Sequence, residues 1–160
     1  SLRASLDLPP APEIAVVCGW GHIDPDHPVL RGRALVLTSD RGVTRLENRL
    51  PDTAVVVSLG RQLRFTGDAI VDALRARGHR RLLSEAGPHT FGTLLRADRV
   101  DELFLTSSPF LAGDAGEGSR LRLVEGADLV PLVASRLLST RRHGDHLFSR
   151  YAVGVGAQST

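Results

Sequence analysis

Residues 80–95 read Arg-Arg-Leu-Leu-Ser-Glu-Ala-Gly-Pro-His-Thr-Phe-Gly-Thr-Leu-Leu, and this stretch decides how the rest of the chain is interpreted. The short apolar run that ends at Ser84 is typical of a buried strand. The apolar residues at 91–95 recur at helical spacing after a proline, which is favoured in the first turn of a helix. We therefore predict a strand at 81–84, a turn, and a helix that begins near Pro88.

This turn is suited to binding an anion such as phosphate, because a helix N-terminus directs free backbone N–H groups and the positive end of the helix dipole outward. Gly87 is expected to allow close approach to the backbone, and a β-branched residue there is expected to resist the geometry of the turn. Pro88 is pre-set for the first helical turn, and Thr90 can supply a hydroxyl. The alternative is a helix that opens with Gly-Pro and binds nothing.

Strand and helix signals alternate before and after this stretch. Apolar runs predict three buried parallel strands, at residues 14–18, 34–38 and 54–57. The connection at 39–52 is short and polar, with room for one helical turn. Apolar residues at helical spacing from Asp68 predict a helix closed by Gly78, and a further strand is expected at 100–107. The pattern predicts an α/β fold built first from parallel strands.

The last third of the chain predicts an antiparallel hairpin. Its two extended segments, 132–142 and 145–153, are joined through His143-Gly144. We expect one domain over residues 1–160, with a leading loop at 1–11 and a flexible tail at 154–160. The mostly parallel central sheet is expected to finish with this antiparallel hairpin.

Composition excludes several function classes. All 20 basic residues are arginine, so neither a Walker A loop nor Schiff-base catalysis by lysine is available. A net charge of +2 with 4% aromatic residues argues against nucleic-acid binding. No apolar run is long enough to span a membrane, and no signal segment opens the chain. The lone Cys18 fits an inert buried thiol in a reducing cytoplasm, which predicts a cytoplasmic protein.

Several motifs together resemble the reductase domain of the riboflavin-pathway deaminase/reductase family. The matching stretches are Leu83-Ser84-Glu85-Ala86-Gly87-Pro88, Gly92, Val100-Asp101-Glu102-Leu103, Pro109, Leu111-Ala112-Gly113 and the closing Arg150-Tyr151. The resemblance covers roughly residues 12–153. It implies a dihydrofolate-reductase-like three-layer α/β sandwich, an NADPH cofactor and a homodimer. The implied reaction reduces the ribosylamino group of 5-amino-6-(5-phosphoribosylamino)uracil, a phosphorylated pyrimidine, to a ribitylamino group.

The resemblance also implies roles for individual residues. Glu85 becomes a substrate contact. The segment that would hold the cofactor pyrophosphate consists of Gly87, Pro88, His89, Thr90, Phe91, Gly92 and Thr93. Position 89 is histidine where relatives often carry a small polar residue, so its side chain is expected to point away from the cofactor. The residues present do not identify a proton donor.

Other positions extend this interpretation. Thr38 and Ser39 end a predicted strand and Arg41 follows, so a hydroxyl and a guanidinium could contact the 2′-phosphate that distinguishes NADPH from NADH. A solvated loop is the alternative for these residues. Gly19 follows the first strand, where family members contact the nicotinamide end.

The opening of the chain departs from the family pattern. Members begin with a Ser-Leu-Asp-Gly-like motif and a Gly-x-Gly-Thr-like turn, and neither motif occurs here. We therefore expect the first part of the domain to be missing from this sequence. Because a single cysteine cannot build a Cys-rich zinc site, deamination is not expected either.

Three clusters of polar residues resemble metal-binding sites, but we expect none of them to bind a metal. The clusters are His22, Asp24, Asp26 and His27; His143, Asp145 and His146; and Asp114 with Glu117. A solvated loop, a hairpin turn and a mobile lid or plain connection explain them, respectively. The resemblance implies an NADPH-dependent reductase, with a dihydrofolate-reductase-like paralogue acting on another heterocycle or a non-catalytic cofactor-binding module as alternatives.

Overall fold

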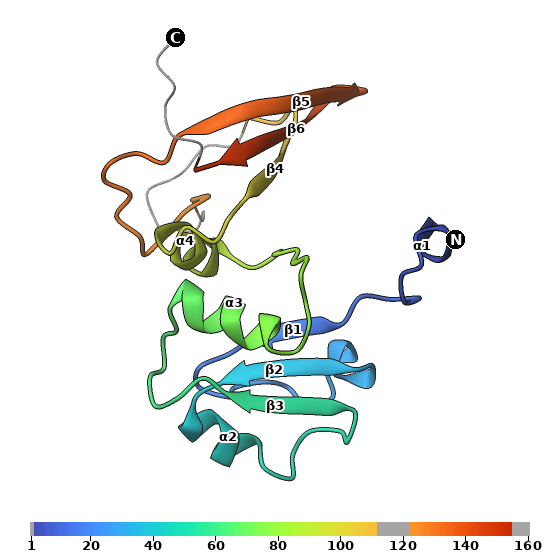
Figure 1. Ribbon diagram of the computed structural model, residues 1–160, viewed down its shortest axis with the longest axis vertical. Helices are drawn as coiled ribbons and strands as arrows, with labels where there is room; N and C mark the ends of the chain where they lie inside the picture. The colour runs from blue at the N-terminus through green and yellow to red at the C-terminus, as the bar shows by residue number, and fades with distance from the viewer. Residues whose placement is uncertain (1, 112–121, 155–160) are drawn as a thin grey trace. The chain divides into compact units, whose positions relative to one another are not determined.

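The computed structural model describes residues 2–111 and 122–154, and Figure 1 shows their helices and strands. The chain divides into two compact units, Ser1–Phe65 and Thr66–Thr160, each with its own three-stranded sheet. The expectation of a single domain stays a prediction. The expected loop around Asp114 and Glu117 and most of the expected tail lie outside the described residues.

The first unit is built on a parallel sheet in the order β1-β2-β3. Its strands are β1 (Ile14–Val17), β2 (Ala34–Thr38) and β3 (Ala54–Ser58). Ile14 lies opposite Ala34 and Ala34 opposite Ala54, so the three strands start level with one another. The parallel pairing confirms the prediction from the apolar runs, but only β2 is buried, because β1 and β3 each keep exposed residues.

The central strand β2 carries the core of this unit, since all five of its residues are buried. Leu30, Ala34, Val36 and Leu46 form one buried cluster. Partly buried side chains pack around that cluster, namely Ile23, Val29, Leu50, Ala54 and Val56. A strand with a partner on each side and cover on both faces reads as a continuous apolar run, which is how Ala-Leu-Val-Leu-Thr reads.

Three segments of this unit contain helical turns that the sequence did not predict or predicted to be shorter. The polar connection after β2 contains α2 (Asp40–Leu46), seven residues rather than one turn, because the Ser39 side chain caps its N-terminus. In Figure 1, α2 runs beside β3. The leading segment contains a single exposed turn, α1 (Leu2–Ser5), and a 3-10 turn (Pro28–Arg31) precedes β2.

The second unit combines two helices with an antiparallel sheet. The helices α3 (Gly67–Arg75) and α4 (Pro88–Arg96) contact each other. Both helices were predicted, and Gly78 follows α3 with φ of 88°, a conformation that glycine adopts readily. An ion pair joins Arg99 to Asp68 in the first turn of α3, 2.7 Å apart, and so links the segment after α4 to α3.

The antiparallel sheet has the order β4-β6-β5. Its strands are β4 (Glu102–Ser107), β5 (Ser135–His143) and β6 (His146–Val153). The hairpin was predicted, but its two-residue turn is Gly144-Asp145, one residue later than expected, because His143 still pairs with His146. Gly144 takes φ of 57° as the first central residue of the turn, a backbone that glycine tolerates best.

The predicted strand at 81–84 is wrong. Residues 80–87 form neither strand nor helix, and no strand among the described residues pairs with them. Their side chains remain exposed, with Leu83 at 79% of its full accessibility. A strand is stabilised by its neighbour's hydrogen bonds and by the face that it buries, and this segment has neither.

The change from parallel to antiparallel pairing was predicted, but the expectation of one continuous sheet is wrong, because the described strands form two separate sheets. No residue of β4, β5 or β6 is buried, although Leu94, Ile70 and Val71 are buried in the two helices of the same unit. In the part of the chain that the structure describes, no helix has the length and apolar character required to cross a bilayer. The mixed parallel and antiparallel α/β architecture agrees with the predicted fold class.

We predict that Leu35→Ala lowers the free energy of unfolding by about 2–5 kcal/mol, because it opens a cavity in a fully buried strand. Urea unfolding followed by circular dichroism measures the change. The matched control is Val55→Ala on the neighbouring strand, where the side chain opposite Leu35 is 42% exposed and its loss should cost much less. Equal losses for the two variants would contradict the assignment of β2 as the core strand.

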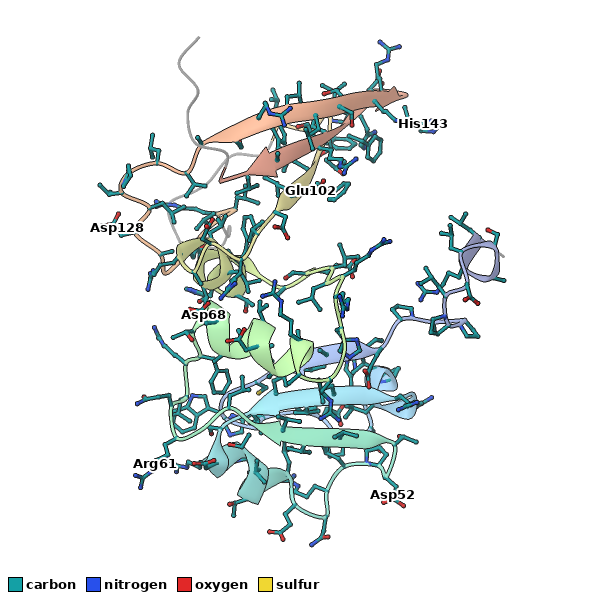
Figure 2. The ribbon with its side chains drawn as sticks, in the orientation of Figure 1. Asp52, Arg61, Asp68, Glu102, Asp128 and His143 are labelled. Carbon is teal, nitrogen blue, oxygen red and sulfur yellow. The ribbon has the colours of Figure 1, made fainter. Side chains whose placement is uncertain are left out.

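An exposed ion pair joins β4 to β6. Arg150 donates from Nε and Nη2 to the two carboxylate oxygens of Glu102, at 2.8 and 2.5 Å, and its Cζ lies 5.7 Å from the Phe104 ring centroid. Glu102, labelled in Figure 2, lies on β4. These hydrogen bonds hold the pKa of Glu102 below its ordinary value near 4.5.

The lowered pKa gives a small acid-dependent contribution to stability. The contribution is present above the pKa of an unfolded glutamate and is lost as the pH falls through the lower folded value. We predict that Arg150→Met lessens the loss of stability between pH 5 and pH 3, measured by urea unfolding at a series of pH values. The exposed Arg141→Met on β5 serves as control. An unchanged pH dependence in Arg150→Met would show that the pair is absent in solution.

Candidate cofactor-binding site

The helix α4 begins at Pro88, where the sequence predicted a helix to start. Gly87 is the N-cap residue, Pro88 stands in the first turn, and this turn contains no acidic residue. No side chain caps the helix, so the first-turn N–H groups of His89 and Thr90 lack an intrahelical acceptor. A side-chain carbon added at Gly87 would meet no atom of the described residues within 4 Å. The space and the free donors fit a phosphate group.

The backbone of Gly87 does not resist a β-branched residue, contrary to the expectation from the sequence. Its φ is −66° and its ψ is 173°, an extended conformation that any residue adopts. A β-branched residue is therefore not opposed by the geometry of this turn. The packing of the described residues does not require glycine at this position either, since a larger side chain at 87 would extend into open space.

The segment around Glu125 packs against the start of α4. The Glu125 amide donates to the Pro88 carbonyl at 3.2 Å, and its carboxylate lies 3.4 Å from His89 Nε2. The other carboxylate oxygen of Glu125 accepts from the Arg122 amide at 2.9 Å. The His89 side chain is thus directed to Glu125, and its orientation relative to a cofactor stays a prediction. The Glu125 carboxylate is also occupied by donors of its own chain.

The remaining residues of the predicted pyrophosphate segment lie along α4. Gly92 is buried, and a β-carbon added there would come within 2.6 Å of the Glu125 carbonyl oxygen. Its small size therefore serves packing. The Thr93 hydroxyl donates to the His89 carbonyl inside the helix at 3.0 Å, whereas Thr90 and Phe91 are half-buried. Glu85 is exposed in the irregular segment before the helix.

In the first unit, the predicted site residues meet where β1 and β2 end. Thr38 and Ser39 are fully buried, so the solvated-loop alternative is wrong for these two. The Thr38 hydroxyl donates to the Cys18 carbonyl at 2.6 Å, and the Ser39 hydroxyl donates to the Gly19 carbonyl at 2.7 Å. Both hydroxyls therefore join the ends of the two strands, and their predicted contact with a cofactor stays a prediction.

Gly19 lies in a crowded position after β1. A β-carbon there would come within 1.9 Å of the Leu63 carbonyl oxygen, a distance that real atoms do not reach. Only glycine can follow this path past residue 63 without moving the backbone. Its predicted contact with the nicotinamide end stays a prediction.

Arg41 is exposed in the first turn of α2 and lies against an aromatic side chain. Its Cζ is 5.2 Å from the centroid of the Trp20 ring, and the Trp20 and His22 rings stack at 6.3 Å with an interplanar angle of 18°. Trp20 is not among the site residues predicted from the sequence. The available signal was a lone tryptophan directly after a strand and a glycine.

The structure groups the predicted site residues into two sets, one in each unit. One set surrounds the ends of β1 and β2, and the other follows the start of α4. Within the described residues, no group of three or more His, Cys, Asp or Glu side chains is placed to hold a metal ion. In the loop at 22–27, Asp24 accepts from the Asp26 amide at 3.0 Å and His27 accepts from the Val29 amide at 3.2 Å.

Comparison with protein families identifies the chain. The family model described as the RibD C-terminal domain matches residues 5–147, most of the 160 residues. The chain belongs to the RibD C-terminal domain family. The match includes the start of α4 and the ends of β1 and β2. No curated protein matches the sequence at a significant level.

Two solved structures resemble this RibD C-terminal domain. A pyrimidine reductase-like protein from Corynebacterium diphtheriae has a TM-score of 0.68 and 22% identity, and the match covers 95% of this chain and 65% of that one. Acinetobacter baumannii RibD has a TM-score of 0.67 and 14% identity, with coverage of 87% of this chain and 37% of that one. This chain thus spans about two thirds of the first structure and about two fifths of the second. The likeness confirms the predicted dihydrofolate-reductase-like α/β fold.

We predict that Ser39→Ala destabilises the domain by about 0.5–2 kcal/mol, because it removes both the cap of α2 and the hydrogen bond to Gly19. Urea unfolding measures the change, and Ser84→Ala in the exposed segment before α4 is the control. A stability equal to that of the parent would mean that the hydroxyl does not join the strands in solution.

Proposed function

We propose that this RibD C-terminal domain acts as an NADPH-dependent reductase of the riboflavin pathway. The substrate would be 5-amino-6-(5-phosphoribosylamino)uracil, whose ribosylamino group becomes ribitylamino. Family membership over residues 5–147 supports a reductase in general. The single structural observation that carries the proposal is the uncapped start of α4, with open space at Gly87 and no acid in the first turn.

The cofactor would be held at two places in the chain. The first turn of α4, from Gly87 through Thr90 and on to Thr93, would bind the pyrophosphate through its free N–H groups. Arg41 would bind the 2′-phosphate as a charged planar donor, because its exposed guanidinium can form paired hydrogen bonds with a phosphate. Thr38 and Ser39 would hold the strand ends from which the segment carrying Arg41 begins.

When bound, NADPH would supply a hydride to the C1′ carbon of the ribosylamino group. The bond between C1′ and the ring oxygen would break, and that oxygen would take a proton, so that the closed ribosyl group becomes an open ribityl chain. Glu85 would accept a hydrogen bond from a polar group of the substrate and so orient it. The contribution of the protein is therefore binding and orientation, while the cofactor carries the redox chemistry.

We also propose a cellular location and an oligomeric state for the protein. We place the protein in the cytoplasm, where a lone thiol such as Cys18 stays reduced. We also propose a homodimer, in which a second copy would cover apolar side chains that the sheet of the second unit exposes, such as Phe104 and Phe148.

The decisive test places a side chain in the open space at Gly87. We predict that Gly87→Val weakens NADPH binding at least tenfold, equivalent to about 1.4 kcal/mol, because the valine occupies the position that the pyrophosphate needs. Enhancement of NADPH fluorescence on binding measures the affinity. Since the φ of Gly87 suits any residue, the variant is expected to fold, and circular dichroism checks this.

The matched control is Gly32→Val in the first unit. A side-chain carbon at Gly32 also meets nothing within 4 Å, and its φ of −99° is ordinary. The control should bind NADPH as the parent does. If folded Gly87→Val also keeps the affinity of the parent, the role of this turn in phosphate binding is wrong. Binding of NADPH without turnover of the pyrimidine would favour a cofactor-binding module instead.

A further inference from the structure

The side chain of Trp20 lies where β1 ends and is only partly covered. It is 46% exposed, although tryptophan is usually well buried in a folded protein. Its ring contacts two neighbours of the first unit, with Arg41 Cζ 5.2 Å from the ring centroid and the His22 ring stacked at 6.3 Å. Arg45 in turn contacts the His22 ring. Trp20 thus lies between an aromatic neighbour and an exposed guanidinium.

The guanidinium of Arg41 lies over the Trp20 ring and forms no ion pair within the described residues. Among the residues that the structure describes, Arg41 has no carboxylate partner. The adjacent Asp40 forms no ion pair with Arg41 among the described residues, and one of its oxygens accepts from the Ser58 hydroxyl at 2.5 Å. A guanidinium that lies over an aromatic ring keeps the N–H groups along its edge free to donate.

Arginine ordinarily loses side-chain freedom when it binds a ligand, and this loss weakens binding. Contact with a ring reduces the loss, because the planar group is already held in one orientation before the ligand arrives. A paired hydrogen bond to a phosphate depends on that orientation, whereas simple charge attraction does not. The stacked arrangement is therefore suited to binding phosphate, and it adds much less to the affinity for a ligand without a phosphate group.

We propose that Trp20 is a positioning residue that holds Arg41 ready for the 2′-phosphate of the cofactor, and so sets the preference of the domain for NADPH over NADH. This inference rests on the proposed function and adds a residue and a cause to it. The ligand chemistry is a phosphate group on the ribose of an adenine nucleotide. Trp20 acts through Arg41, and the inference assigns it no contact with the reacting atoms.

The test uses two nucleotides that differ only in this phosphate, adenosine 2′,5′-bisphosphate and adenosine 5′-monophosphate. Trp20 is the sole tryptophan of the chain, so quenching of its fluorescence reports binding beside Arg41 directly. Isothermal titration calorimetry gives the affinities for variants that lack the tryptophan. The measured quantity is the ratio of the two affinities, which does not depend on the nicotinamide or on turnover.

We expect the parent to bind the bisphosphate at least tenfold more tightly than the monophosphate, and Arg41→Ala to abolish this ratio. Trp20→Ala should lower the ratio at least threefold while the affinity for the monophosphate stays the same. Trp20→Phe, which keeps an aromatic face, should retain most of the ratio. In the Arg41→Ala background, Trp20→Ala should have no further effect on the ratio, since the two residues act together. The control Arg61→Ala, at another exposed arginine of the same unit, should leave the ratio unchanged.

Four results would overturn the inference. They are a ratio near one in the parent, an unchanged ratio in folded Trp20→Ala, an equal loss of both affinities in that variant, and a loss of the ratio in Arg61→Ala. These failures are distinguishable from failure of the proposed function. A parent that binds NADPH with no preference for the 2′-phosphate keeps the proposed reductase but rejects the role of Trp20. A parent that binds none of these ligands rejects both.

Discussion

Two buried hydroxyl groups join the strand ends on which the first unit depends. Thr38 and Ser39 end the central strand and donate to the carbonyl groups of Cys18 and Gly19, at the point where β1 ends. The Ser39 side chain also accepts from the Gly42 amide and so starts α2. These bonds fix where the chain leaves each strand. The positions of Trp20 and Arg41 follow, because each lies within two residues of a bonded group.

The second unit is organised differently, around contacts of its helices. The buried residues of the described part lie in α3 and α4, while the strands of the sheet hold only half-buried and exposed residues. The start of α4 is held by the segment at 124–127, which approaches closely because Gly92 has no side chain, and the Arg96 side chain donates to the Gly126 carbonyl at 2.5 Å. This packing leaves the N-cap at Gly87 open.

Much of this fold could be predicted from the local pattern of apolar residues. The errors arose at elements whose structure depends on contacts with residues far away in the sequence. The run at 34–38 indicated a buried strand because it carries its own apolar pattern, and the helix after Asp68 carried its own period. The run at 81–84 had a similar pattern, but a strand also needs a neighbour, which the pattern does not reveal. The stacking of Arg41 on Trp20 was missed for the same reason, since it depends on where two separate segments end. For Glu85, the pattern and the structure leave its substrate role a prediction.

The outer edge of β5 has a consequence for the behaviour of the protein at high concentration. This strand lies at the edge of its sheet, and all nine of its residues are exposed. An open edge is a template for pairing between molecules and hence for aggregation. Three of its nine residues are arginine, and an exposed histidine ends it. Two copies that meet edge to edge along β5 bring like charges together, so the strand resists growth into an extended intermolecular sheet while its main chain remains accessible.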